Sequence, residues 1–166
     1  MRQRPENPWF WYRRRPAVVR VFMSYSHIDE ALRDRLEVHL APLKRQGVAL
    51  WHDRRLLAGD ALEDGIGAAL AEADVVLLLV SPDFLASSAC HDGEMQHAVD
   101  RHRTGRARVI PVILRACDWL STPLRHLLAV PRDGRPVTLW PDQDQALHEV
   151  AVAIRRAVLE RTPLAS

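Results

Sequence analysis

The chain has 166 residues, of which 48% are apolar and 27% charged, and its net charge is +2. This length and balance fit one globular domain with its own core, and a net charge so close to zero gives no argument for nucleic-acid contact. Two cysteines exclude a disulfide framework or a cysteine-rich zinc site. No apolar run approaches a membrane span or a signal-peptide core, so we expect a cytoplasmic protein.

The first 16 residues differ in composition from the rest. They hold three prolines, the aromatic run Trp9–Tyr12 and the triplet Arg13–Arg15. We expect residues 1–16 to form a flexible arm outside the fold, although aromatics beside arginines would also suit a partner or a membrane surface. We expect residues 162–166 to be a short tail, which leaves residues 17–161 as the domain.

Strand and helix signals alternate along this domain. The apolar runs that predict strands are Val18–Ser24, Val48–Trp51, Val75–Val80, Arg108–Leu114 and, more weakly, Val137–Leu139. Helical spacing predicts helices at Asp29–Gly47, Ala61–Ala73, Asp92–His102 and Gln145–Glu160, with a short helical region at Trp119–Ala129. This alternation predicts an α/β fold, in which a parallel sheet carries helices on both faces.

Two loops stand out by their position in such a fold. With strand order 2-1-3-4-5, ligands bind between strands one and three, beyond their carboxyl ends. The loop Ser24–Asp29 follows strand one, and the loop after strand three leads to Glu94. Glu94 is therefore the main candidate site residue, and neighbouring Asp92 would raise the pKa of a carboxylate there. The alternative is that these acids only favour a helix N-terminus.

Several common site motifs are absent from the sequence. Gly65 and Gly67 lie in an expected helix and lack the rest of a phosphate-binding loop. There is no G-x-S-x-G elbow and no His-Glu-x-x-His pair. Scattered histidines, which we interpret as surface residues of helices, are His39, His97, His126 and His148. We expect no metal and no bound cofactor.

Four segments together resemble a bacterial TIR (Toll/interleukin-receptor-like) domain over residues 19–159. They are Val21–Asp29, Leu50–Asp53 with Leu57–Asp60, Leu79–Cys90 with Glu94 and Met95, and Val109–Trp119. The stretch Pro131–Trp140 also resembles the end of such domains. The resemblance implies a flavodoxin-like, three-layer fold with five parallel strands in the order 2-1-3-4-5.

Many TIR domains of this type cleave NAD⁺ at the nicotinamide–ribose bond, giving ADP-ribose or a cyclic isomer. The resemblance implies that Glu94 is the catalytic glutamate. It also implies substrate contacts for the first loop and the loop after strand two, at Tyr25, Ser26, His27, Asp53 and Leu57. NAD⁺ would be the substrate, and TIR–TIR self-assembly and a sensor outside this chain would control an activity in antiviral defence.

One departure from the family pattern concerns the loop after strand two. Relatives often carry an aromatic residue shortly after the loop glycine, where its ring stacks on substrate, but this chain has Leu62 after Gly59. Loss of such stacking costs about 0.5–1.5 kcal/mol. The missing aromatic favours one alternative, a non-catalytic TIR scaffold that signals by assembly. A second alternative is an enzyme similar to nucleoside deoxyribosyltransferases, which share the fold type and a catalytic carboxylate.

Overall fold

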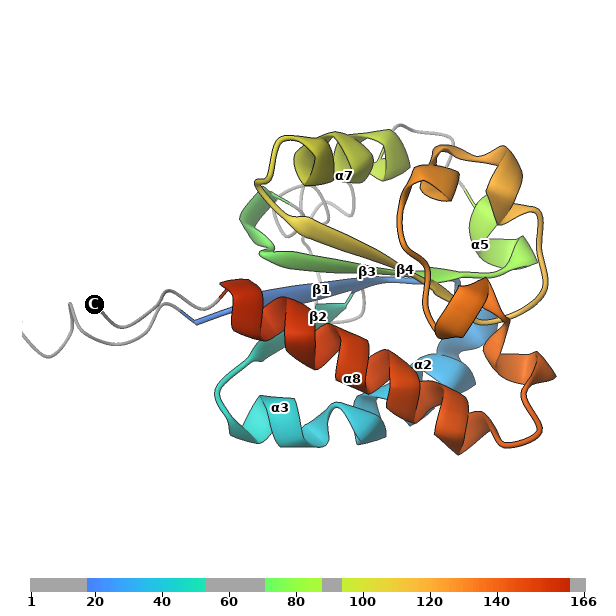
Figure 1. Cartoon of the computed structure of the whole chain (residues 1–166), viewed down its shortest axis with the longest axis horizontal. Coiled ribbons are helices and arrows are strands. Elements are labelled where there is room, and N and C mark those ends of the chain that lie inside the picture. Colours follow the sequence, from blue (N-terminus) through green and yellow to red (C-terminus); the bar gives the residue numbers. More distant parts are fainter. Residues whose placement is uncertain (1–17, 53–70, 88–93, 162–166) are drawn as a thin grey trace, which may run out of the picture.

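The computed structural model describes residues 18–52, 71–87 and 94–161. In this part of the chain a parallel sheet of four strands, in the order β2-β1-β3-β4, carries helices on both faces (Figure 1). The strands are β1 (Arg20–Ser24), β2 (Ala49–His52), β3 (Val75–Val80) and β4 (Arg108–Ile113). The α/β class, the parallel sheet and the first four strands are thus confirmed.

Strand β3 forms the centre of the core because it is apolar at every position. All six of its residues are buried, as expected for a strand covered on both faces of a parallel sheet. Its first residue, Val75, pairs with Val21 of β1 on one side and Arg108 of β4 on the other. The carboxyl ends of β1, β3 and β4 therefore lie along one edge of the sheet.

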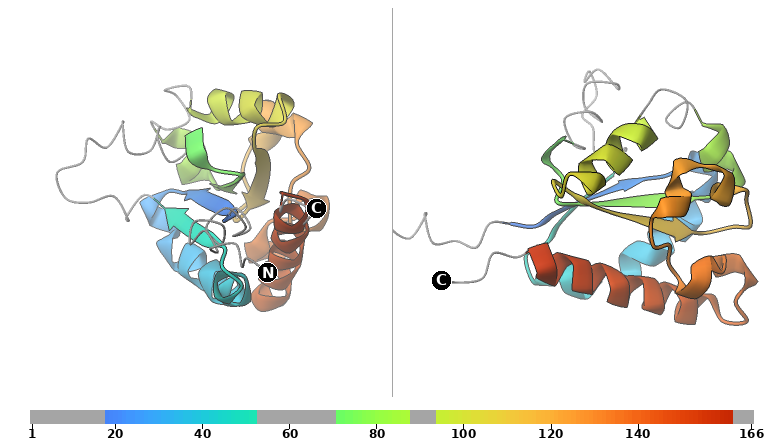
Figure 2. Two further views of the ribbon diagram at one scale, coloured as in Figure 1. Left: turned by 90° about the vertical axis from the view of Figure 1, so that its left-hand side faces the viewer. Right: turned by 45° about the horizontal axis from the view of Figure 1, so that its top comes forward.

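Helices cover the two faces unequally (Figures 1 and 2). One face packs against α2 (Glu30–His39), α3 (Ala41–Arg45) and the long α8 (Gln143–Arg161). The other face packs against α5 (Pro82–Ala86), α7 (Glu94–Arg103) and the 3-10 turns η3 (Trp119–Ser121) and η4 (Pro123–His126). These three layers match the expected architecture.

The helix expected over Asp29–Gly47 is two helices. Helix α2 ends at His39 and α3 begins at Ala41, with Pro42 in the first turn of α3. A proline has no N–H to donate and its ring clashes with the carbonyl four residues earlier, so it starts a helix and does not continue one. Gly47 follows the end of α3 with a positive φ of 95°, as expected for a terminating glycine.

The fifth strand predicted at Val137–Leu139 is wrong. These residues form the 3-10 turn η6, in which Val137 is fully buried and Thr138 donates a backbone hydrogen bond to Leu114. Two prolines, Pro131 and Pro136, precede the turn, and proline cannot donate to a strand ladder. Apolar residues in this stretch fill the core without pairing in the sheet.

Several expectations lie outside the described residues. They concern the arm at residues 1–16, most of the helix predicted at Ala61–Ala73, and the tail at residues 162–166.

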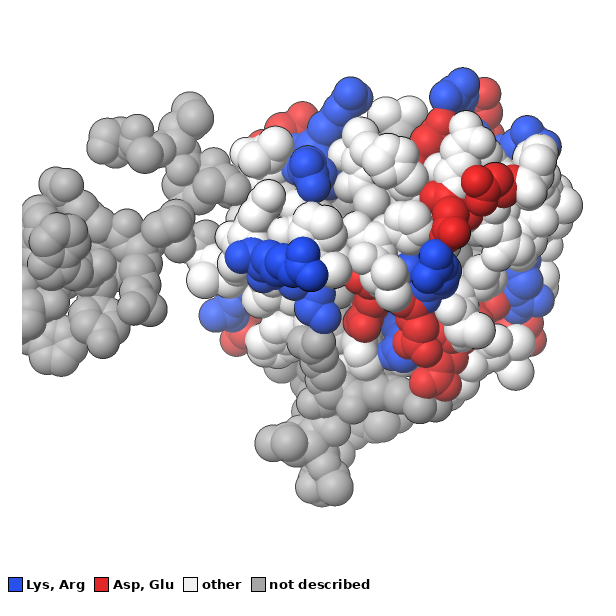
Figure 3. Space-filling view, turned by 90° about the horizontal axis from the view of Figure 1, so that it is seen from below, with Lys and Arg blue, Asp and Glu red and all other residues white. Residues whose placement is uncertain are grey.

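No helix among the described residues is both long and apolar enough to cross a membrane. On the face built from α2, α3 and α8, positive and negative side chains lie next to one another (Figure 3).

Helix α8 is tied to α2 by one carboxylate. Asp144 accepts hydrogen bonds from Nε of Arg35 at 2.9 Å, from its Nη2 at 3.0 Å, and from Nε2 of His39 at 3.1 Å. The hydrogen bonds from Arg35, and then from His39, lower the pKa of Asp144 to about 2. The ionised carboxylate is therefore the form that joins the two helices.

This pairing predicts a pH-dependent contribution to stability. An unfolded aspartate titrates near pH 3.9, so the folded pKa is the lower of the two. The stabilisation is present above that pH and is lost as the pH falls toward 2. We expect Asp144→Asn to lower the thermal unfolding midpoint at pH 6 but not at pH 2. Calorimetric curves that stay equally separated from pH 6 to pH 2 would contradict the pairing.

Candidate functional site

The candidate site lies at the carboxyl edge of the sheet, where several loops start. Strands β1, β3 and β4 end there, at Ser24, Val80 and Ile113. Helix α7 runs back along the sheet from this edge toward the start of β4 (Figure 1). Its first residue, Glu94, is therefore at the end of the helix that faces the same edge.

The loop after β1 forms the 3-10 turn η1 (His27–Asp29) at this edge. Ser26 caps the turn, because its hydroxyl oxygen accepts a hydrogen bond from the Ile28 N–H at 3.3 Å. His27 and Ile28 are exposed and Ser26 is half-buried. Two of the predicted substrate contacts, Ser26 and His27, are thus accessible side by side.

Asp29 fixes this turn to the residues that follow β3 and β4. Its side chain is only 1% exposed, yet it is surrounded by donors. One carboxylate oxygen accepts a hydrogen bond from the hydroxyl of Ser81, which follows β3, and the other accepts from Nε of Arg115, which follows β4, at 2.8 Å. Asp29 directly precedes α2, where an aspartate usually caps a helix, but its side chain makes no capping hydrogen bond.

Ser81 and Arg115 extend this network beyond Asp29. The Ser81 oxygen also accepts from the backbone N–H of Phe84 at 3.1 Å, which caps α5. Arg115 also contacts Asp83 in the first turn of α5. Hydrogen bonds to Asp29 and then to Asp83 raise the pKa of the Arg115 guanidinium above its usual value. One cation therefore lies between two carboxylates, and the ends of three strands are joined.

Tyr25, Arg33 and His52 form a second polar cluster next to the loop after β1. Tyr25, another predicted substrate contact, is 5% exposed, and its hydroxyl accepts a hydrogen bond from Nη1 of Arg33 at 2.7 Å. The same guanidinium lies 3.0 Å from Nδ1 of His52, the last residue of β2. The structure therefore gives Tyr25 a packing role beneath His27, whose ring meets it edge to face at 6.3 Å. Direct contact of Tyr25 with substrate stays a prediction.

The remaining predicted residues lie outside what the structure describes. These are the side chain of Glu94, its neighbours His91 and Asp92, and Asp53, Leu57 and Leu62 of the loop after β2. His52 marks where that loop begins. The contacts of His52 with Arg33 hold the end of β2 against α2.

Sequence reasoning missed Arg115 and Arg33 as parts of the site. The sequence contains a pattern that could have identified Arg115. A charged residue that directly follows an apolar parallel strand lies at the carboxyl edge of the sheet. Arg33 lies on a helix and is followed by two more charged residues, Asp34 and Arg35. Nothing in that pattern distinguishes its buried side chain from an exposed one.

The described residues at this edge offer a hydroxyl, an imidazole and fixed charges. Among them, no group of three histidine, cysteine, aspartate or glutamate side chains could hold a metal ion. Cys117 is half-buried, and burial raises the pKa of its thiol, which makes it a poor nucleophile at neutral pH. The edge is therefore suited to binding and to electrostatic stabilisation.

Comparison with known proteins decides the family. The family model for the TIR domain matches residues 21–151. The chain belongs to the TIR domain family. The fold agrees, since the TIR domain of the Toll-related receptor TRR-2 from Hydra magnipapillata superimposes with a TM-score of 0.59, at 21% identity, over 82% of this chain and 96% of that one.

A relative of this TIR domain is the uncharacterized protein y4lF from Sinorhizobium fredii (strain NBRC 101917 / NGR234). The two are 55% identical over 147 residues, which make up 88% of this chain and 46% of the relative. This chain thus spans less than half the length of the curated protein that it matches. The expected domain limits, 17 and 161, stay predictions, and the matched residues lie within them.

The buried network predicts unequal costs for its two carboxylates. Asp29→Ala leaves the Ser81 hydroxyl proton without an acceptor and removes one of the two carboxylates that pair with Arg115, so we expect a loss of about 2–4 kcal/mol in the free energy of unfolding. The matched change Asp83→Ala removes a side chain that is 43% exposed, and should cost about 1 kcal/mol or less. Urea unfolding measures both, and equal losses would contradict the central role of Asp29.

Proposed function

We propose that this TIR domain cleaves NAD⁺ at the nicotinamide–ribose bond, with Glu94 as its catalytic carboxylate. The supporting observation is that α7 begins at Glu94 and faces the sheet edge that carries the exposed Ser26 and His27. The TIR family includes members that cleave NAD⁺ as well as members that only signal. A glutamate at this point of α7 is the family feature on which the choice depends.

The chemistry requires little more than one ionised carboxylate. Breaking the bond between ribose and a cationic nicotinamide releases a neutral leaving group, which needs no proton from an acid. Positive charge then develops on the ribose, and a nearby carboxylate stabilises it and can hold the ribose hydroxyls. Water as the acceptor gives ADP-ribose, and an adenine nitrogen of the same molecule gives a cyclic product.

The first and second loops would hold the substrate against this carboxylate. Ser26 and His27 supply hydrogen-bonding groups at the end of β1, and the network around Asp29 keeps them in place. Asp53 and Leu57 would contribute from the loop after β2. Because that loop lacks the aromatic residue common in relatives, we propose that assembly of several TIR domains is needed to complete the site.

The cellular role follows from the family and from the length of the relative. We propose a cytoplasmic effector of bacterial antiviral defence, controlled by a sensor domain or a sensor protein. The relative y4lF is more than twice as long as the matched region, so a relative of this domain exists with further chain attached. Such additional chain is where a sensor would lie.

The role of Glu94 is tested by NAD⁺ consumption on a clustered protein. We expect Glu94→Gln to lower the rate at least about 100-fold, because the stabilising charge is removed. Asp100→Asn is the matched control, since Asp100 is exposed near the other end of the same helix and its carboxylate accepts a hydrogen bond from Gln96 of that helix. Chromatography of the products identifies the acceptor.

Three results would overturn parts of this proposal. Equal rates for the wild type and Glu94→Gln would remove Glu94 from the reaction. Assembly of the wild type, seen by sedimentation, without any loss of NAD⁺ would favour the TIR scaffold that signals by contact alone. Activity on deoxynucleosides but not on NAD⁺ would instead favour a deoxyribosyltransferase-like enzyme.

A substitution at His27 tests substrate binding without changing the stability of the fold. Its side chain is exposed, so we expect His27→Ala to leave the urea midpoint unchanged and to raise the KM for NAD⁺ several-fold. His97→Ala, an exposed histidine within α7, should change neither quantity. An unchanged KM for His27→Ala would show that the first loop does not touch the substrate.

A further inference from the structure

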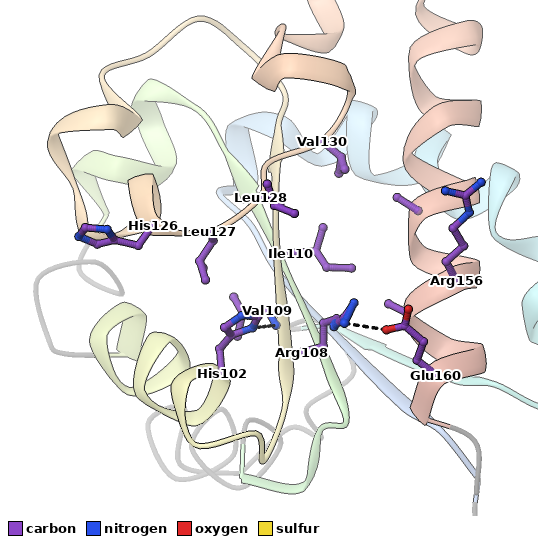
Figure 4. Close-up of a pocket in the computed structure, with 12 residues that line it drawn as sticks. His102, Arg108, Val109, Ile110, His126, Leu127, Leu128, Val130, Arg156 and Glu160 are labelled. Carbon is purple, nitrogen blue, oxygen red and sulfur yellow. Dashed lines mark hydrogen bonds and ion pairs between the residues drawn. The ribbon is translucent and has the colours of Figure 1, made fainter. Parts of the chain in front are cut away.

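A groove lies away from the candidate site, beside the outer edge of β4 (Figure 4). It has a volume of about 460 Å³ and lies between the end of α7, the segment Leu127–Val130 and α8. Its lining includes Arg108, Val109 and Ile110, which form the first half of β4. The candidate site follows the last residue of β4, so about 10–20 Å of strand separates the two.

Specific contacts join each wall of this groove to β4. Val130 pairs with β4, since its N–H donates to Pro111 and its carbonyl accepts from Ile113, both at 2.9 Å. On the other side, Arg108 of β4 forms an ion pair of 2.6 Å with Glu160 of α8. These contacts join the segment on one side and the helix on the other to β4, which lies between them.

The edge of β4 offers no free donor to an added strand. Its outward N–H groups belong to alternate residues. The Val109 N–H donates to Nδ1 of His102 at 3.0 Å, Pro111 has no N–H, and the Ile113 N–H donates to Val130. Pairing with a strand requires such donors. The occupant of the groove is therefore not a β-strand.

The residues that line the groove indicate which kind of ligand it could bind. Ile110, Leu127 and Ala157 form its buried floor, and Leu128 is 93% exposed at its mouth. Glu160 is already paired with Arg108, whereas Arg156 is exposed and makes no hydrogen bond or ion pair with the described part of the chain. An apolar floor beside the exposed guanidinium of Arg156 complements an aliphatic chain that ends in an anion.

We propose that this groove binds a small amphipathic anion, such as a single aliphatic chain that carries a carboxylate or a phosphate. The chain would lie along Ile110 and Leu127 beneath Leu128, and the anionic group would bind Arg156. This site does not depend on the proposed NAD⁺ chemistry, because it uses none of the same residues.

Decanoate, kept below its micelle concentration, is the probe. NMR spectra of the isotope-labelled full chain should show saturable shifts at Ile110, Leu127, Leu128 and Ala153. Arg156→Glu should weaken binding at least tenfold. Arg155→Glu is the matched control, since Arg155 is also exposed on α8 but does not line the groove, and it should change the affinity less than about twofold.

Three further experiments test where the ligand binds and which head group it needs. Ala153→Phe fills the groove, and should abolish the shifts while the protein stays folded by circular dichroism. Decyl phosphate in place of decanoate tells a phosphate head group from a carboxylate. Decanol and decyltrimethylammonium should bind at least tenfold more weakly than decanoate. The proposal is overturned by the absence of saturable shifts at millimolar decanoate, by equal losses in the two arginine variants, or by equal binding of the uncharged or cationic probe.

Discussion

The carboxylate of Asp29 is the interaction on which the carboxyl edge of the sheet depends. It is buried, and it receives a hydrogen bond from the residue that follows β3 and another from the residue that follows β4. A buried charge is costly unless its partners are fixed. The loop after β1 is therefore held in one position relative to the other strands, and the exposed pair Ser26 and His27 is held with it.

Local pattern was enough to predict most of the fold. Apolar strands without alternation, separated by helical spacing, define a parallel sheet, and β3 and β4 were predicted to within one residue. The errors fall where backbone chemistry competes with apolarity. Pro42 divides one expected helix into two, and the prolines that precede Val137–Leu139 keep this segment out of the sheet although Val137 is buried.

From the sequence, the segments that form the site could be predicted, but their tertiary contacts could not. Spacing placed the first loop and Glu94 near one sheet edge, but it could not assign Asp29 to a buried ion pair with a residue 86 positions away. Such long-range pairs depend on tertiary contacts, and an aspartate at a helix start is equally well explained as a cap. For the same reason Tyr25, which reads as a loop residue, was not recognised as buried beneath Arg33.

The central claim is that NAD⁺ binds between the first loop and the start of α7. A crystal structure of the assembled protein with a carbocyclic NAD⁺ analogue, which resists cleavage, tests it most directly. We predict that the nicotinamide-bearing ring lies beside Ser26 and His27, with the Glu94 carboxylate about 3 Å from its hydroxyl groups. An analogue bound elsewhere, for example in the groove beside β4, or a Glu94 carboxylate directed away from it, would contradict the account.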